Sequence, residues 1–176
     1  MELGATLCVP RSPRCDACPV ARFCDARAAG DAEALPVKAK RRAPLPMRGA
    51  AALLLRGGKA LAVRRPPRGL LGGLWDLPGG ELAEGESAQA GLARALAEGV
   101  GLRAGRLRQV GAVEHVFTHR VLRLQVFRAS AAGGRVRLRG FDAHRWVDPE
   151  ALAKLPHGAA TAKALALVGL AEGPSK

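Results

Sequence analysis

The sequence predicts an α+β (α/β) domain, a mixed sheet flanked by helices, preceded by a small cysteine-rich segment and a linker. Three observations predict this fold class. Short apolar runs alternate with Gly- and Pro-rich turns, helical stretches lie among them without regular alternation, and all four cysteines fall within the first 24 residues. The expected parts are a cysteine segment at 1–30, a basic Pro-rich linker at 31–47 and the domain at 48–172.

The first half of the domain is predicted to contain a hairpin, a further short strand and a helix. Gly57-Gly58-Lys59 separates two apolar runs, which is typical of a hairpin turn. Ser87 precedes an alanine-rich stretch and is a suitable helix N-cap. The predicted segments are strands at 50–56 and 60–65, an irregular segment at 66–73, a strand at 74–77 and a helix at 87–98.

The second half is predicted to be mostly strand, with helices at the end. Leu122, Leu124 and Val126 alternate with polar residues, as on a half-buried strand. Asp148 precedes Pro149, a pair that is typical of a helix N-terminus. The predicted segments are strands at 107–116 and 121–127, a turn at 130–134, an edge strand at 136–138, a strand at 144–147 and helices at 149–155 and 159–170.

The net charge of +13 indicates a polyanionic partner, and nucleic acid is the commonest one. GC-rich codons also enrich arginine, but they do not explain why only 15 residues are acidic. No apolar run reaches the length of a membrane span and no signal peptide is evident, which disfavours membrane and secreted proteins. We expect a cytoplasmic, nucleoid-associated protein that is a monomer. Arginines are dense in the second half: Arg103, Arg106, Arg108, Arg120, Arg123, Arg128, Arg135, Arg137, Arg139 and Arg145.

The cysteines Cys8, Cys15, Cys18 and Cys24 are separated by six, two and five residues. Two disulfides, a zinc site and an iron–sulfur cluster are the alternatives. Disulfides are disfavoured without an export signal, and structural zinc sites usually use two tight pairs, whereas only Cys15 and Cys18 form one here. The spacing therefore favours a [4Fe–4S] cluster over zinc.

The cysteine segment resembles the iron–sulfur loop of the endonuclease III and adenine glycosylase superfamily, including Pro10, Pro13 and the Cys18-Pro19 pair. The resemblance implies a structural cluster that shapes a basic loop against DNA phosphates. It assigns that contact to Arg11, Arg14 and Arg22. The basic residues of the linker are four further candidates for contact with the DNA backbone: Lys38, Lys40, Arg41 and Arg42.

A second motif resembles the Nudix box, G-x5-E-x7-R-E-U-x-E-E-x-G-U, where U is apolar. Gly80, Glu86, Arg94 and Glu98 are in register with it, but Ala95 and Gly99 replace two glutamates that bind metal in that family. Hydrolysis of a diphosphate needs a carboxylate cluster to hold Mg²⁺. The box is therefore expected to be structural, with Glu86 forming a salt bridge to Arg94.

An iron–sulfur loop followed by a degenerate Nudix box resembles the C-terminal part of the MutY family of adenine DNA glycosylases. In that family the Nudix-like domain recognises 8-oxoguanine opposite adenine, and an aromatic–Ser/Thr–His triplet on a hairpin contacts the lesion. Phe117, Thr118 and His119 match the triplet. Phe117 is expected to stack on a base, Thr118 to hydrogen-bond the lesion, and His119 to contact phosphate or orient the loop.

The resemblance implies a C-terminal portion of an adenine-specific DNA N-glycosylase of base-excision repair, with duplex DNA containing an 8-oxoguanine:adenine pair as partner. The catalytic and helix-hairpin-helix regions of that family lie upstream of its iron–sulfur loop, and this chain contains neither. No catalytic residue is therefore assigned. The alternatives are a divergent Nudix hydrolase of nucleoside diphosphate derivatives and a non-enzymatic iron–sulfur redox or regulatory module.

Because excision needs an acid that protonates the adenine and a carboxylate that stabilises the sugar cation, the 176-residue chain is expected not to excise adenine alone. The measurement is chromatography of free adenine after incubation with a duplex that contains the lesion pair. Release of adenine above the protein-free level would contradict this expectation.

Overall fold

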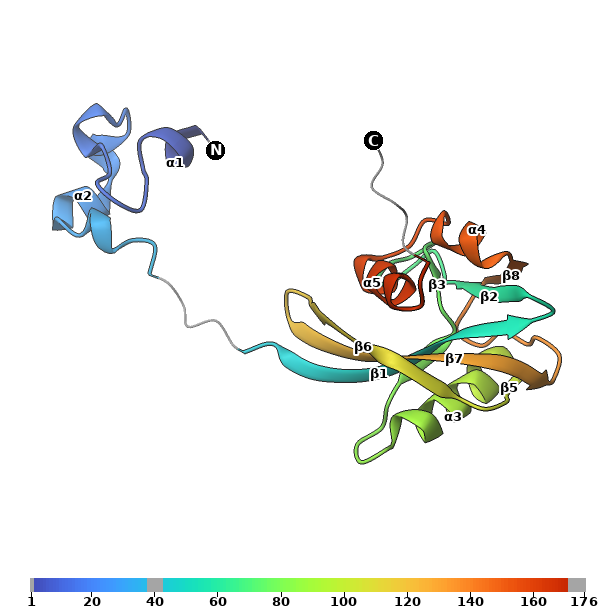
Figure 1. Ribbon diagram of the computed structural model, residues 1–176. Helices are drawn as coiled ribbons and strands as arrows, with labels where there is room; N and C mark the ends of the chain where they lie inside the picture. Colours follow the sequence, from blue (N-terminus) through green and yellow to red (C-terminus); the bar gives the residue numbers. More distant parts are fainter. Residues whose placement is uncertain (1, 38–42, 171–176) are drawn as a thin grey trace. The chain divides into compact units, whose positions relative to one another are not determined.

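The computed structural model describes residues 2–37 and 43–170, and the chain divides into two compact units, 1–42 and 43–176. The smaller unit consists of short turns and helices, and none of its residues 2–37 is fully buried. A segment without a buried core depends on another source of stability, such as a metal centre or a partner. Its elements are α1 (Glu2–Thr6), 3₁₀ turns at Cys15–Ala17, Ala21–Phe23 and Ala32–Ala34, and α2 (Asp25–Ala29) (Figure 1).

The larger unit is built on one eight-stranded mixed sheet in the part of the chain that is described. Its longest ladder is parallel and runs from the Leu45–Arg120 pair to the Leu55–Ser130 pair, while every other pairing is antiparallel. The predicted mixed sheet is thereby confirmed. The strands are β1 (Leu45–Arg56), β2 (Lys59–Arg64), β3 (Trp75–Asp76), β4 (Gly79–Glu81), β5 (Arg103–Ala104), β6 (Arg108–Val116), β7 (Arg120–Gly133) and β8 (Ala143–Val147).

Helices cover both faces of this sheet (Figure 1). Strand β1 is buried on both sides because alternate residues pack against different helices. Leu54 lies in the core cluster with Leu92 and Leu96 of α3 (Ala88–Val100). Leu53 lies in the other cluster with Leu165 of α5 (Ala159–Leu167). The remaining helix is α4 (Pro149–Ala153).

The local predictions mostly agree with the structure. The hairpin at Gly57–Lys59 joins β1 to β2, and the Ser87 side chain accepts a hydrogen bond from the Ala90 N–H at 3.3 Å. Asp148 occupies its N-cap position without a side-chain hydrogen bond. Strand β1 begins at Leu45, inside the segment expected to be linker. Within the described residues, no helix is long and apolar enough to cross a membrane.

Two predictions after residue 129 are wrong. The segment expected to turn at 130–134 continues β7 to Gly133, because β1 and β5 pair with it there. The expected edge strand at 136–138 is an extended segment outside the sheet. Its Arg137 N–H donates to Val100 O, at the end of α3, rather than to a strand. Long-range pairing overrides the turn preference of this Ser-Ala-Ala-Gly-Gly sequence.

Candidate functional site

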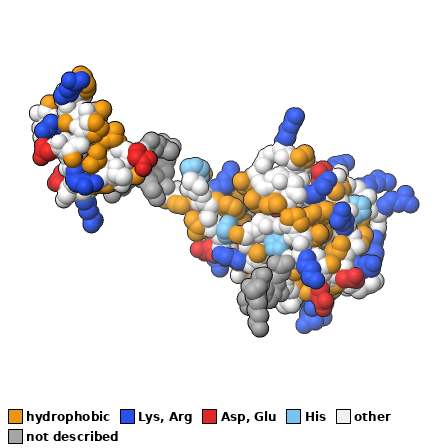
Figure 2. Space-filling model, turned by 90° about the horizontal axis from the view of Figure 1, so that it is seen from above, with side chains coloured by type: hydrophobic (Ala, Val, Ile, Leu, Met, Phe, Trp, Pro, Cys, Tyr) orange, Lys and Arg blue, Asp and Glu red, His pale blue; other side chains and the backbone are white. Residues whose placement is uncertain are grey.

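The larger unit contains a cleft of about 1080 Å³ that brings together two of the sequence motifs. The box helix α3 contributes Ala95, Glu98 and Gly99 to its wall. The hairpin between β6 and β7 contributes all three residues of the triplet, Phe117, Thr118 and His119. In the space-filling view, Lys and Arg side chains protrude around the larger unit, with hydrophobic surface exposed between them (Figure 2).

The triplet forms a tight turn at one end of the sheet. The Phe117 N–H donates to Arg120 O at 2.7 Å, and the Leu45 N–H donates to His119 O at 3.0 Å. These bonds tie the turn both to its own strand and to the first residue of β1. The turn therefore has a defined backbone conformation and presents its side chains from a rigid sheet.

The three side chains of the turn differ in exposure. Phe117 is half-buried and meets His115 edge to face, with ring centroids 4.6 Å apart and an interplanar angle of 81°. Phe117 belongs to neither core cluster, so packing inside the domain does not account for it. Thr118 and His119 are exposed. An aromatic ring, a hydroxyl and an imidazole are thus available to a ligand at the rim of the cleft.

The box arginine is surrounded by acceptors. Arg94 donates to both carboxylate oxygens of Glu86, at 2.9 and 2.8 Å, to Glu98 at 3.3 Å, and to the Glu81 carbonyl at 3.2 Å. Glu86 also accepts from the Ala83 N–H at 2.9 Å. The expected Glu86–Arg94 salt bridge is confirmed, and it fastens the loop before α3 to the helix.

These bonds shift the titration of both partners. The hydrogen bonds from Arg94, and then that from the Ala83 backbone, lower the pKa of Glu86 from 4.5 to about 2. The same bonds to Glu86 raise the pKa of Arg94. Glu86 is therefore held as a carboxylate and is committed to Arg94 rather than to a metal ion.

The face of α3 toward the cleft lacks the carboxylates that phosphate-hydrolysing metal sites use. Of the three positions 95, 98 and 99 that line the cleft, only Glu98 carries one. Among the described residues, no group of three or more His, Cys, Asp or Glu side chains is placed to hold a metal ion. A divalent ion at this face would have a single carboxylate ligand, already bonded to Arg94.

Sequence reasoning missed a polar centre on the wall of the cleft. Asp76 accepts from Arg65 at 2.7 Å, from the Thr161 hydroxyl at 2.8 Å and from the Leu77 N–H at 2.9 Å. Its side chain is only 18% exposed. Asp76 thus joins β3 to α5, and no local pattern marks it, because Thr161 lies 85 residues away in the sequence.

The smaller unit places its cysteines on successive tight turns. The Cys18 N–H donates to Cys15 O, and the Cys24 N–H donates to Ala21 O. All four cysteines are free thiols, and Cys8 is exposed. Four unpaired thiols in a unit without a buried core fit the donor set of an iron–sulfur cluster. As described, the residues 2–37 do not gather three of these sulfurs around one point.

The basic residues of the N-terminal part that are predicted to contact DNA differ in their surroundings. Arg11 is exposed. Arg14 donates to the Thr6 carbonyl at 2.8 Å, and the Arg22 guanidinium lies 4.5 Å from the centroid of the Phe23 ring. The predicted linker contacts Lys38, Lys40, Arg41 and Arg42 lie outside the described residues.

Comparison with protein families gives two matches at the positions of the two motifs. Residues 50–167 match the model of the NUDIX domain. Residues 8–24 match the iron–sulfur binding domain of endonuclease III. The two resemblances drawn from residue spacing, and the fold class expected from them, are thereby confirmed.

Individual relatives agree with these matches. The adenine DNA glycosylase of Homo sapiens is 31% identical over 180 residues, which cover 76% of this chain and 33% of the relative. The CTP pyrophosphohydrolase of Escherichia coli is 28% identical, covering 60% of this chain and 78% of the relative. The crystal structure of a MutT NUDIX hydrolase from Burkholderia pseudomallei superposes with a TM-score of 0.62 at 26% identity, covering 70% and 98%. The chain thus spans about a third of the length of the glycosylases it matches.

The Glu86–Arg94 pair generates a test by pH. Because the pKa of Glu86 is lowered in the folded state, its contribution to stability is complete above the unfolded value of 4.5 and is lost as the pH falls toward 2. Glu86→Gln should therefore lower the melting temperature most above pH 5, and the difference from the parent should shrink below pH 4. Thermal unfolding followed by circular dichroism measures this, with Glu84→Gln, an exposed glutamate of the same loop, as the matched control. A deficit independent of pH would contradict the ion-pair explanation.

Proposed function

The chain belongs to the NUDIX domain family through its residues 50–167, and we propose that it reads DNA rather than hydrolysing nucleotides. Its function in this proposal is the lesion-recognition part of an adenine DNA glycosylase of base-excision repair. It recognises 8-oxoguanine opposite adenine in duplex DNA and acts as a monomer. The observation that carries the proposal is that the triplet Phe117–His119 and the carboxylate-poor face of α3 line the same cleft.

The exposed hydroxyl of Thr118 supplies the discrimination. 8-Oxoguanine presents a donor at N7 and an acceptor at O8, whereas guanine presents only an acceptor at N7. A hydroxyl both donates and accepts, so Thr118 can accept from N7–H and donate to O8 of the lesion, whereas guanine offers it only the N7 acceptor. It stands on a turn held by backbone hydrogen bonds from Phe117 and Leu45. The backbone that carries the hydroxyl is therefore ordered before DNA binds, which lowers the ordering cost of recognition.

Phe117 and His119 position the base that Thr118 reads. The Phe117 ring rests edge-on against His115 and keeps part of its surface free. Stacking of a base on such a ring contributes roughly 1–3 kcal/mol. His119, exposed beside it, donates to a phosphate or to the sugar–phosphate backbone. The three side chains divide the task into stacking, hydrogen bonding and backbone anchoring.

The smaller unit contributes an iron–sulfur cluster and a second contact with DNA in this proposal. Cys8, Cys15, Cys18 and Cys24 hold a [4Fe–4S] cluster, whose bound iron supplies the structural cross-link that a unit without buried residues needs. Arg11 is free to meet phosphate, and Arg14 and Arg22 shape the surrounding loop through Thr6 and Phe23. The match to the endonuclease III iron–sulfur domain and the similarity to the glycosylases support this assignment.

A nucleotide hydrolase is the second candidate function. The superposition on a MutT NUDIX hydrolase and the similarity to a CTP pyrophosphohydrolase favour it. Glu98 alone remains of the three carboxylate positions on the cleft face of α3, which argues against it. Hydrolysis of a diphosphate also needs an ion held firmly against the phosphate oxygens.

The lesion-reading proposal is tested by Thr118→Ala. Loss of one hydrogen bond of about 1 kcal/mol should lower the preference for the lesion over guanine roughly 3- to 10-fold. Affinity for undamaged duplex should stay within about twofold. Thr118→Ser, which keeps the hydroxyl, is the matched control and should retain the preference. Fluorescence anisotropy with paired duplexes measures both ratios, and an equal loss of affinity on the two DNAs would argue against this role for Thr118.

The hydrolase alternative is tested by release of phosphate or pyrophosphate from nucleoside diphosphate derivatives with Mg²⁺. We expect no release above the protein-free rate, because the cleft lacks two of the carboxylates. Glu98→Gln is the control that separates this chain from a contaminating enzyme. Release by the parent that Glu98→Gln abolishes would establish the hydrolase and overturn the proposal.

A further inference from the structure

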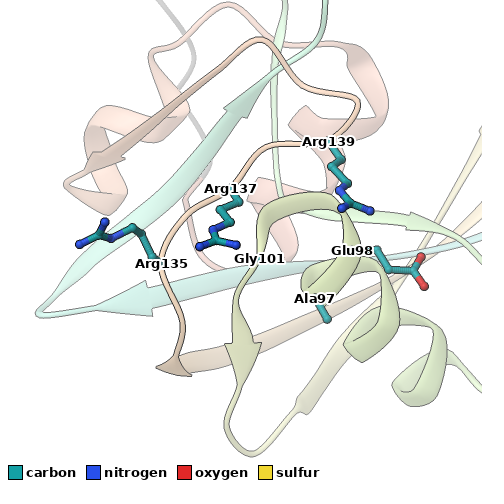
Figure 3. A pocket seen from close by; sticks show the side chains of 6 residues that line it. All are labelled: Ala97, Glu98, Gly101, Arg135, Arg137 and Arg139. Atoms are coloured by element: carbon teal, nitrogen blue, oxygen red, sulfur yellow. The ribbon is translucent and has the colours of Figure 1, made fainter.

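A second cavity, which the proposed function does not use, lies at the C-terminal end of α3. Its volume is about 470 Å³. Three arginines from one extended segment and three residues from the helix end face it (Figure 3). We call residues 135–139 the arginine strap. The lining residues are Ala97, Glu98, Gly101, Arg135, Arg137 and Arg139.

The strap holds its three guanidinium groups in a row. Val136 and Leu138 pack against the core cluster of α3, while the three arginines between and beside them are exposed. The Arg137 N–H donates to Val100 O at 2.9 Å, and the Arg139 N–H donates to Gly99 O at 2.8 Å. Alternate residues of an extended chain repeat at about 6.6 Å. Arg135, Arg137 and Arg139 thus occupy alternate positions of the segment that passes the end of the helix.

Close approach of the strap to the helix depends on glycine. A Cβ atom on Gly101 would lie 2.8 Å from the Arg135 carbonyl oxygen and 3.1 Å from the Arg137 Cβ. Gly101 also has a backbone φ of 71°, a value that residues other than glycine rarely adopt. The backbone of the strap is therefore fixed against α3, and its side chains are the parts free to bind.

The charges of the strap are not used within the described residues. Arg64, Arg65 and Arg94 each pair with a carboxylate, at 3.0, 2.7 and 2.8 Å. The strap arginines have no such ion pair in the part of the chain that the structure describes. Glu98 is the acidic residue of the cavity, and Arg94 already binds it at 3.3 Å. Three guanidinium groups, which are weakly hydrated and so lose water at a small cost, thus face a cavity with little negative charge.

We propose that Arg135, Arg137 and Arg139 bind successive phosphates of one DNA strand directly, without a divalent ion. A guanidinium matches the geometry of a phosphate through two parallel hydrogen bonds. Arg139 also lines the cleft that holds the Phe117–His119 triplet, so the strap borders that cleft. The inference rests on the proposed function, because it takes DNA as the ligand.

The strap also explains how phosphate can be held where the box has lost its acidic residues. Position 99 carries no side chain, and an ideal Cβ there would lie 3.5 Å from the Phe141 ring and 3.9 Å from the Arg139 carbonyl oxygen. A glutamate there would compete for the adjacent guanidinium groups. With glycine at this position, positive charge at the end of α3 comes from arginine side chains and does not require a bound cation.

The test is the salt dependence of binding to an undamaged duplex in buffer that contains EDTA. Each phosphate contact contributes about −0.9 to the slope of log K against log salt. The triple variant Arg135→Gln, Arg137→Gln, Arg139→Gln should therefore show a slope shallower by about 2 to 3. The ratio of affinities for lesion and undamaged DNA should stay unchanged. Replacement of the same three residues by lysine, which keeps the charge, should retain most of the slope.

The matched control removes three exposed positive charges that line neither cavity: Lys59→Gln, Arg108→Gln and Lys154→Gln. A strap variant that behaves like this control while the parent prefers the lesion would overturn the inference and leave the proposed function intact. A parent without lesion preference whose slope still depends on the strap would overturn the proposed function alone. Absence of binding to any duplex by the parent would overturn both. Circular dichroism confirms that each variant is folded.

Discussion

The parallel pairing of β1 with β7 is the constraint on which the rest of the larger unit depends. Eleven residue pairs, from Leu45–Arg120 to Leu55–Ser130, fix the register of the two longest strands. The Phe117–His119 turn precedes β7 directly, and the arginine strap follows it. A shift by one residue would turn every buried side chain of β1 to the opposite face. The core on both faces therefore also sets the position of both candidate binding segments.

The sequence was sufficient for features that depend on neighbours along the chain. Gly57 and Gly58 specified a hairpin, Ser87 specified a helix start, and the spacing from Gly80 to Glu98 identified the box and its missing carboxylates. Features that depend on partners far away in the sequence could not be predicted from it. Residues 130–133 favour a turn locally but pair with β1 and β5, and Asp76 meets Thr161 only because α5 folds onto the sheet. The strap is likewise visible as arginines in the sequence, but not as a row against α3.

The cleft keeps the framework of the Nudix box while two of its glutamate positions are changed. Arg94 retains its bonds to Glu86, Glu98 and the Glu81 carbonyl, so the loop and helix of the box keep their geometry. Positions 95 and 99, where the Nudix box has glutamate, are Ala and Gly and offer no side-chain ligand to a metal ion. The wall of the cleft of about 1080 Å³ combines apolar and basic groups with the acidic residues Asp76, Glu81 and Glu98. Asp76 and Glu98 are each bonded to an arginine, at 2.7 and 3.3 Å.

The hydrogen bond from the Leu45 N–H to the His119 carbonyl has a mechanical consequence. Leu45 is the first residue of β1, and the boundary between the two units lies only two residues before it. A force on the chain just before Leu45 therefore reaches the Phe117–His119 turn through the Leu45 peptide group and one hydrogen bond.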